Sequence, residues 1–155
     1  MWYDSPTYGI KIGYPSNWVK YEKWQGLKGD MVVVFGPLKE RATDPHFEFV
    51  GIQIKKLATT FTLEQYIHLN INNLKLNNPD FVLIESSSIT LAGMQGHRIV
   101  CSKNGRKEMH NIILRQNLQY NVGYLADPSD YARYLPIVYK MLDSFEISDT
   151  SQYRI

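Results

Sequence analysis

Four side chains on two adjoining segments are of types that bind metal ions: His97, Cys101, Glu108 and His110. The segments flank Asn104-Gly105, and such a pair between two alternating runs is the strongest short-range signal for a β-hairpin. A two-residue turn here fixes the cross-strand pairs as Cys101 with Glu108, Ile99 with His110 and His97 with Ile112. The four side chains then share one face of the hairpin, within reach of one another. Imidazole, thiolate and carboxylate groups bind zinc and other divalent ions, so the hairpin is a candidate metal site.

The same hairpin face also carries Ile99 and Ile112. A partly buried structural face with polar residues toward its end has the same pattern, so this interpretation stands beside the metal site. Elsewhere, Glu64 and His68 are four residues apart on one expected helix, but no second histidine completes a metal-binding motif there. That pair is interpreted as a surface contact.

The hairpin is also rich in basic residues, and these could meet an acidic partner. Five basic side chains stand there against Glu108 alone: Arg98, Lys103, Arg106, Lys107 and Arg115. Of these, Arg98, Arg106 and Lys107 are our candidates for partner binding. The alternative is a solvated hairpin end with no partner.

Aromatic residues make up 13% of the chain, and 11 of them are tyrosines. Most fall at strand or helix spacing, where aromatic side chains usually form the core. Three do not fit this explanation: Trp24, Tyr134 and Tyr139. Tyr134 and Tyr139 lie off the main apolar stripe of the last expected helix, so we expect them to be exposed. These three residues are added to the candidate partner surface.

The sequence gives little support for catalysis. Ser86-Ser87-Ser88 is not part of a Gly-x-Ser-x-Gly motif and has no histidine close by in sequence. Gly93-Met94-Gln95-Gly96 is too short for a phosphate-binding loop and lacks the required Lys and Ser or Thr. We therefore expect a non-enzymatic protein without a cofactor, and keep an unrecognised hydrolase only as a third alternative.

Length and composition predict one globular domain at residues 1–147, followed by a frayed tail at 148–155. The chain has 155 residues, a formal net charge of +2 and one cysteine. A balanced charge is not typical of a nucleic-acid binder, and a single cysteine excludes an intrachain disulfide. The sequence shows no membrane span and no signal peptide. It leaves the oligomeric state and the compartment open, between a cytoplasmic protein and a domain excised from an exported parent.

Alternating and β-branched runs predict strands at 8–14, 19–24, 31–35, 47–57, 81–84, 88–91, 97–103, 106–115 and 120–125. A charged loop is expected at 38–45 and a turn at 93–96. Thr62 and Gln65 form a capping box that starts a helix, with Phe61 and Tyr66 as its hydrophobic staple. A second helix is expected within 129–145, where Pro136 either lies in its first turn or kinks it. This order of elements predicts an α+β domain built on an antiparallel sheet.

Several of these segments, in the same order, resemble the PsbP-like domains. They are Tyr8-Gly9-Ile10-Lys11-Ile12-Gly13-Tyr14-Pro15 with Asn17-Trp18, Thr62 to Tyr66, Leu91 to Gly96, and Tyr134 to Ile147. The resemblance spans about residues 3–147 and implies a central antiparallel sheet of about six strands with helices packed on both faces. The same fold occurs in Ran-binding Mog-type and DcrB-type proteins, and members of the PsbP family act as accessory, assembly or binding modules. PsbP relatives in plants and cyanobacteria bind photosystem II.

From this resemblance we expect a protein-binding or assembly module with an unidentified protein partner. The alternative is a small-ligand or lipid-binding domain with a cavity between sheet and helix. A deep apolar pocket favours the ligand, and an exposed aromatic patch favours the protein partner.

Overall fold

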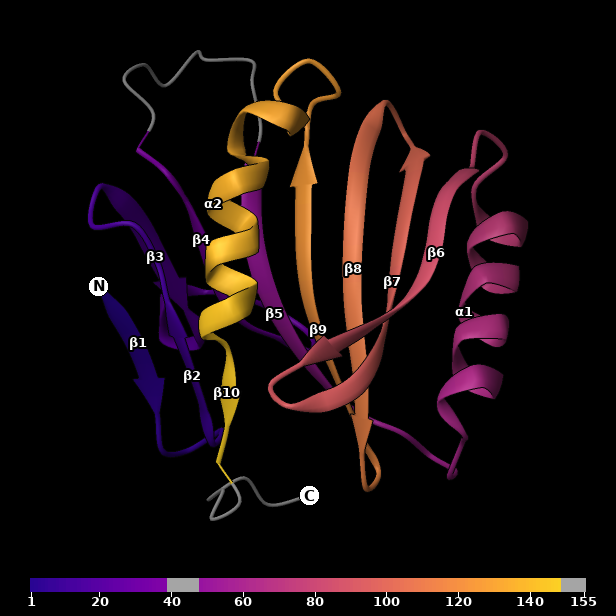
Figure 1. Cartoon of the computed structure of the whole chain (residues 1–155), viewed down its shortest axis with the longest axis horizontal. Coiled ribbons are helices and arrows are strands. Elements are labelled where there is room, and N and C mark those ends of the chain that lie inside the picture. Colours follow the sequence, from indigo (N-terminus) through magenta and orange to yellow (C-terminus); the bar gives the residue numbers. More distant parts are fainter. Residues whose placement is uncertain (39–47, 149–155) are drawn as a thin grey trace.

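A seven-stranded antiparallel sheet forms the centre of the protein (Figure 1). This computed structural model describes residues 1–38 and 48–148. The strands lie in the order β3-β4-β5-β9-β8-β7-β6. Their bounds are Trp18–Glu22 (β3), Met31–Pro37 (β4), Glu48–Lys56 (β5), Val82–Leu91 (β6), Met94–Lys103 (β7), Arg106–Arg115 (β8) and Leu118–Ala126 (β9). The expected antiparallel α+β architecture is confirmed, with a main sheet of seven strands rather than about six.

Strands β6 to β9 form a continuous meander joined by two-residue turns. The turns use left-handed backbone at Ala92-Gly93, at Asn104-Gly105 and at Gln116. At the second turn φ is 52° for Asn104 and 74° for Gly105, as a tight hairpin turn that matches the strand twist requires. The predicted pairs Cys101–Glu108, Ile99–His110 and His97–Ile112 are all confirmed.

A smaller sheet of three strands lies beside the main one, in the order β1-β2-β10. Strand β2 (Ile10–Gly13) pairs on one side with β1 (Trp2–Ser5) and on the other with β10 (Glu146–Ile147). Both pairings are antiparallel. Because β1 and β10 both pair with β2, the first strand of the chain and the strand that follows the last helix lie in one sheet (Figure 1). A single 3₁₀ turn, Lys23–Gln25, follows β3.

Helix α1 (Leu63–Asn77) covers part of one face of the main sheet, beside β6 and β7 (Figure 1). The predicted capping box is confirmed, because Thr62 Oγ1 accepts from the Gln65 amide at 3.1 Å and Gln65 Oε1 accepts from the Thr62 amide at 3.0 Å. Phe61 and Tyr66 contact each other edge to face, as the staple predicts. Tyr66 and Ile67 pack into a small apolar cluster with residues of β7, β8 and the segment after β5: Ile99, Ile112 and Leu57.

Helix α2 (Tyr131–Ser144) covers the opposite face and encloses the main core. Its inward residues are the ones that helical spacing predicts: Tyr131, Val138, Met141 and Leu142, followed by Phe145. Tyr131 stacks on Tyr124 of β9 with ring centroids 4.9 Å apart, which fills the space between the helix and the sheet. Pro136 lies inside the helix, which begins at Tyr131, and not in its first turn.

Several expectations about the elements need correction. The strand expected at 19–24 ends at Glu22, where the 3₁₀ turn Lys23–Gln25 begins. The segments 81–84 and 88–91 are one strand, β6, because an edge strand tolerates the polar residues 85–87 that separate the two expected pieces. The turn expected at 93–96 is Ala92-Gly93, and β7 already begins at Met94. The loop expected at 38–45 and the tail at 148–155 lie outside the described residues, except for Leu38 and Ser148. Within the described ranges, the helices are too short or too polar to cross a membrane.

Candidate functional site

Three of the four candidate metal ligands come together on the β7–β8 hairpin. The ligand atoms of Cys101, Glu108 and His110 all lie within 4.8 Å of one another. Cys101 is opposite Glu108 across the two strands, and His110 is two residues further along β8 on the same face. Cys101 and Glu108 are buried, with 0% and 3% of their surfaces exposed, and His110 is half-buried. The face is the one that α1 partly covers.

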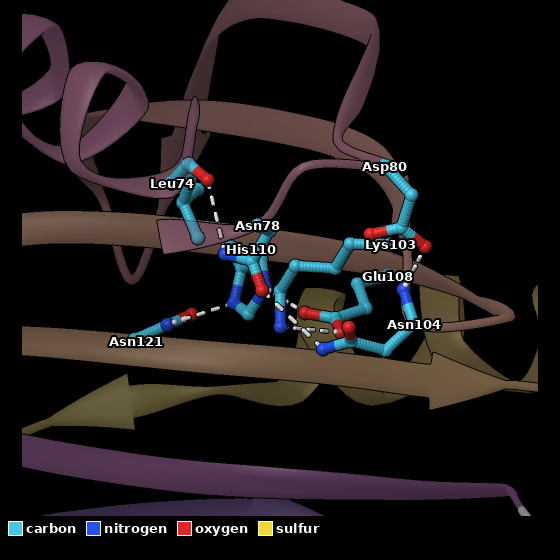
Figure 2. Close-up of polar contacts among 8 residues, drawn as sticks. All are labelled: Leu74, Asn78, Asp80, Lys103, Asn104, Glu108, His110 and Asn121. Carbon is cyan, nitrogen blue, oxygen red and sulfur yellow. Dashed lines mark hydrogen bonds and ion pairs between the residues drawn. The ribbon is translucent and has the colours of Figure 1, made fainter. Parts of the chain in front are cut away.

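The two oxygens of the Glu108 carboxylate contact two different cationic or polar side chains, Lys103 and His110 (Figure 2). One of its oxygens lies 2.8 Å from His110 Nε2, and the other lies 3.1 Å from Lys103 Nζ. Burial alone would raise the pKa of Glu108, but the contacts with His110 and Lys103 outweigh it and hold that pKa below its ordinary value. The carboxylate is therefore charged, and the cluster attracts cations.

Cys101 is a neutral thiol in this environment. Its burial, together with the nearby Glu108 carboxylate, raises the pKa of the thiol to about 11. A thiol with this pKa carries almost no thiolate at neutral pH, so Cys101 is unsuited to act as a nucleophile.

Asn121 of β9 belongs to the cluster and was missed by the sequence reasoning. Its Nδ2 lies 3.0 Å from His110 Nδ1, and its Oδ1 is buried with no hydrogen-bond partner among the described residues. Figure 2 shows the amide aimed at the imidazole ring. With the ring proton on Nε2 and donated to Glu108, Nδ1 accepts from the amide. The only sequence signal was the presence of two polar residues, Gln119 and Asn121, in a mostly apolar strand.

The turn of the hairpin is fastened to the end of α1 (Figure 2). The Asn104 amide donates to Asp80 Oδ2 at 2.7 Å, and Asn104 Nδ2 donates to Asn78 Oδ1 at 3.3 Å. Asn78 in turn donates to the Leu74 carbonyl at the last turn of the helix. These bonds limit the movement of the turn that aligns Cys101 with Glu108.

His97, the fourth candidate ligand, is not part of the cluster. Its Nε2 lies 2.7 Å from Ser86 Oγ on β6. Both residues line a hollow of about 440 Å³ between α1 and the strands β6 and β7. Desolvation lowers the pKa of His97, which favours the neutral ring as the acceptor of the Ser86 hydroxyl proton.

The Ser86–His97 pair resembles two thirds of a catalytic triad, although the serine has no histidine nearby in sequence. A triad also needs a group that orients the other ring nitrogen of the histidine. None of the hydrogen bonds recorded within residues 1–38 and 48–148 involves His97 Nδ1. Ser86 lies on an exposed edge strand rather than on a sharp strand-to-helix turn. The geometry therefore fits a surface contact better than a nucleophile.

Two of the candidate partner-binding residues, Arg98 and Tyr139, come together on the other face of the sheet. The Arg98 guanidinium lies 5.4 Å from the centre of the Tyr139 ring, and Tyr139 is 42% exposed. Arg98 Nε donates at 2.7 Å to Oδ1 of the fully buried Asn111, whose Nδ2 donates to the Val122 carbonyl. The guanidinium of Arg98 is thus fixed by a hydrogen bond to Asn111 and packs beside the ring of Tyr139.

Arg98 and Tyr139 line an open groove of about 550 Å³. Its walls come from the turn between β6 and β7, the second half of α2, and β10. The apolar lining includes Ile89, Leu91 and Ile147, and Asp143 and Glu146 add acidic groups. The groove therefore combines apolar surface with both signs of charge.

The remaining candidates are scattered. Trp24 is 79% exposed on the 3₁₀ turn after β3, and Lys107 lies over the ring of the buried Tyr131 at 4.3 Å. Arg106 is exposed at the start of β8. Tyr134 is half-buried, with its ring against the buried Trp18. The exposure that we expected for it is therefore wrong, and Tyr134 packs against the core. The basic hairpin residues do not form one patch, because Lys103 pairs with Glu108 while Arg98 and Lys107 meet aromatic rings of α2.

The sequence matches no protein-family model, and no curated protein resembles it significantly. Solved structures do resemble it. Cyanobacterial PsbP (CyanoP) from Synechocystis sp. PCC 6803 is 14% identical with a TM-score of 0.65, covering 95% of this chain and 91% of that chain. LpqN of Mycobacterium tuberculosis, described as involved in cell envelope biogenesis, is 16% identical with a TM-score of 0.65 over 90% and 83% of the two chains.

The Ran-binding protein Mog1p of Saccharomyces cerevisiae has the same arrangement of elements. It is 10% identical with a TM-score of 0.63, over 94% of each chain. At these identities the likeness concerns the fold alone. The PsbP-like fold that the sequence predicts, shared with Mog-type proteins, is therefore confirmed.

Proposed function

We propose that this domain is a non-enzymatic module that binds a protein partner, and that the Arg98–Tyr139 groove is its docking surface. The observation that carries the proposal is the held guanidinium of Arg98. Its Nε donates to Asn111, and within the described residues no hydrogen bond or ion pair involves its two terminal nitrogens. A guanidinium held in this way loses little side-chain entropy when it binds a carboxylate.

Tyr139 adds the second property of a binding surface. Tyrosine and arginine are both enriched among the residues that contribute most to binding at protein interfaces. The half-buried Ile89 and Ile147 supply apolar area to bury, and Asp143 and Glu146 add acidic groups for a basic group of the partner. We infer that the partner presents a carboxylate next to an apolar side chain.

The fold comparisons agree with binding as a role, since Mog1p is named for binding Ran. The alternative of a ligand or lipid cavity between sheet and helix has less to support it. Beneath α2, Tyr124 and Tyr131 stack and Val138 and Met141 are buried. The hollow beneath α1 is not an apolar pocket, because polar side chains such as Ser86, Ser88 and His97 line it beside the apolar ones.

Capture from a lysate of the source organism tests the proposal when matched variants are compared. The double variant Arg98→Glu, Tyr139→Ala should lose a protein that the wild type retains. Lys55→Glu is the control, because it makes the same charge change at an exposed site on the opposite face of the sheet. The captured protein is then purified and titrated into each form, with an expected loss of affinity of about 10- to 100-fold in the double variant only. Equal affinity for all three forms would contradict the proposal.

A further inference from the structure

We propose that Cys101, Glu108 and His110 form a binding site for a thiophilic divalent ion of the zinc class. The site lies on the opposite face of β7 from Arg98, so it is independent of the docking groove. Sulfur, nitrogen and carboxylate oxygen are the donors that zinc prefers, and the three donor atoms already lie within 4.8 Å of one another.

The donor atoms are close to the spacing that zinc needs. Zinc–ligand bonds of about 2.0–2.3 Å place donors roughly 3.3–3.7 Å apart in a tetrahedron. His110 Nε2 and Glu108 Oε1 are 2.8 Å apart, and all three donors fall within 4.8 Å. Small side-chain rotations are enough to bring the three donors around one ion. The fourth position is left for water or another ligand.

Charge balance also favours a divalent ion at this position. A thiolate and a carboxylate together offset the two charges of the ion, and the neutral imidazole adds none. In the metal-free protein the positive charge next to the carboxylate comes from Lys103, whose Nζ lies 3.1 Å from Glu108 Oε2. About a fifth of the Lys103 side chain is exposed (19%), so it can turn toward water and open the path to the carboxylate.

Asn121 supplies the supporting contact that a metal-bound histidine needs. When Nε2 binds a metal, Nδ1 carries the ring proton and must donate it, most often to an oxygen. The buried Oδ1 of Asn121 has no partner among the described residues, while Nδ2 of the same amide is 3.0 Å from His110 Nδ1. Rotating the Asn121 side-chain amide by about 180° exchanges its oxygen and nitrogen. Oδ1 then faces His110 Nδ1 and accepts a hydrogen bond from it.

The test uses the full chain after treatment with a chelator, and Zn²⁺ and Co²⁺ as probes. Calorimetry with Zn²⁺ should give one site per chain with a dissociation constant below about 1 μM. The Co²⁺ complex should show the charge-transfer absorption of a cobalt–thiolate bond. Cys101→Ser should abolish this absorption, and Cys101→Ser and His110→Gln should each weaken zinc binding by more than about 100-fold.

Two further variants separate a metal site from a purely structural ion-pair network. Lys103→Met removes the competing ammonium group and should bind Zn²⁺ more tightly than the wild type, whereas a structural network alone predicts only a loss of stability. His97→Gln is the matched control, because His97 contacts Ser86 instead, and its zinc affinity should equal that of the wild type.

Lys103→Met and the wild-type cobalt spectrum keep the test decisive even if Cys101→Ser fails to fold. Zinc binding weaker than about 1 μM in the wild type overturns the proposal. So does a cobalt complex without the thiolate absorption, or a loss of zinc affinity in His97→Gln as large as in His110→Gln.

Discussion

The hydroxyl of Tyr124 on β9 donates a hydrogen bond of 2.8 Å to the carbonyl oxygen of Tyr131, the first residue of α2. The two rings also stack, with their planes 26° apart. Tyr124 is 0% exposed, and burial raises the pKa of its hydroxyl, so the group stays protonated and remains a donor. This contact joins the start of α2 to the centre of the sheet.

Replacing Tyr124 by Phe should therefore destabilise the protein by about 0.5–1.5 kcal/mol, since the hydrogen bond that joins β9 to the start of α2 is lost. Tyr21→Phe is the control, because Tyr21 is 51% exposed and its hydroxyl is accessible to water. Urea unfolding of both variants measures the effect, and the Tyr21 change should stay within about 0.5 kcal/mol. Equal stabilities of the two variants would contradict the role of the bond.

Gly96 on β7 leaves no room for a side chain. A Cβ at this position would lie 2.7 Å from Ile113 Cγ2 and 2.8 Å from the Ile112 carbonyl oxygen. The backbone oxygen cannot move without disturbing the β7–β8 pairing, so Gly96→Ala should cost about 1–3 kcal/mol. Gly123→Ala is the matched control, because the nearest atom to its Cβ would be His110 Nδ1 at 3.5 Å. Thermal unfolding should show a clearly lower midpoint for Gly96→Ala only.

The stability of the protein should depend on His97 at mildly acidic pH. Desolvation lowers the pKa of His97 in the folded state below its ordinary value of about 6.5. The unfolded chain therefore binds the proton more tightly, and the stability present above about pH 6.5 is lost as the pH falls through the folded pKa. Unfolding midpoints of the wild type and His97→Gln, measured from pH 8 to pH 5, should converge or cross on acidification. A constant difference over this range is the contrary result.

The Cys101 thiol should resist modification in the folded protein. It is 0% exposed and its pKa is about 11, so both access and thiolate are lacking at pH 8. A disulfide reagent should label it slowly in buffer and rapidly, with one thiol per chain, in concentrated denaturant. Rapid labelling of the native, metal-free protein would show that the β7–β8 hairpin opens easily.

Local sequence signals predicted the local structure well. Asn104-Gly105 specified the turn, and the turn alone fixed the register that places Cys101 opposite Glu108. Thr62 and Gln65 likewise marked the start of α1, because a capping box depends only on residues three apart. Three of the four predicted metal ligands lie together for this reason.

Long-range contacts were beyond the same reasoning. His97 lies on β7 together with Cys101, but its contact is with Ser86, and that contact depends on β6 pairing with β7. Asn121 reaches His110 only because β9 returns beside β8. Tyr139 meets Arg98 because α2 crosses the sheet at one particular position, which no spacing within either segment specifies. Strand β1 was missed because its partner β2 supplies the pairing that its short sequence does not signal.

The order of strands also implies that different parts of the sheet form at different stages of folding. Strands β6 to β9 pair with their neighbours in sequence, whereas β5 pairs with β9 across the whole segment 57–117. Closing so long a loop carries an entropy cost that each two-residue turn of the meander avoids. The meander is therefore the part that can form early, and the β5–β9 ladder, which joins it to β3 and β4, is the natural rate-limiting step.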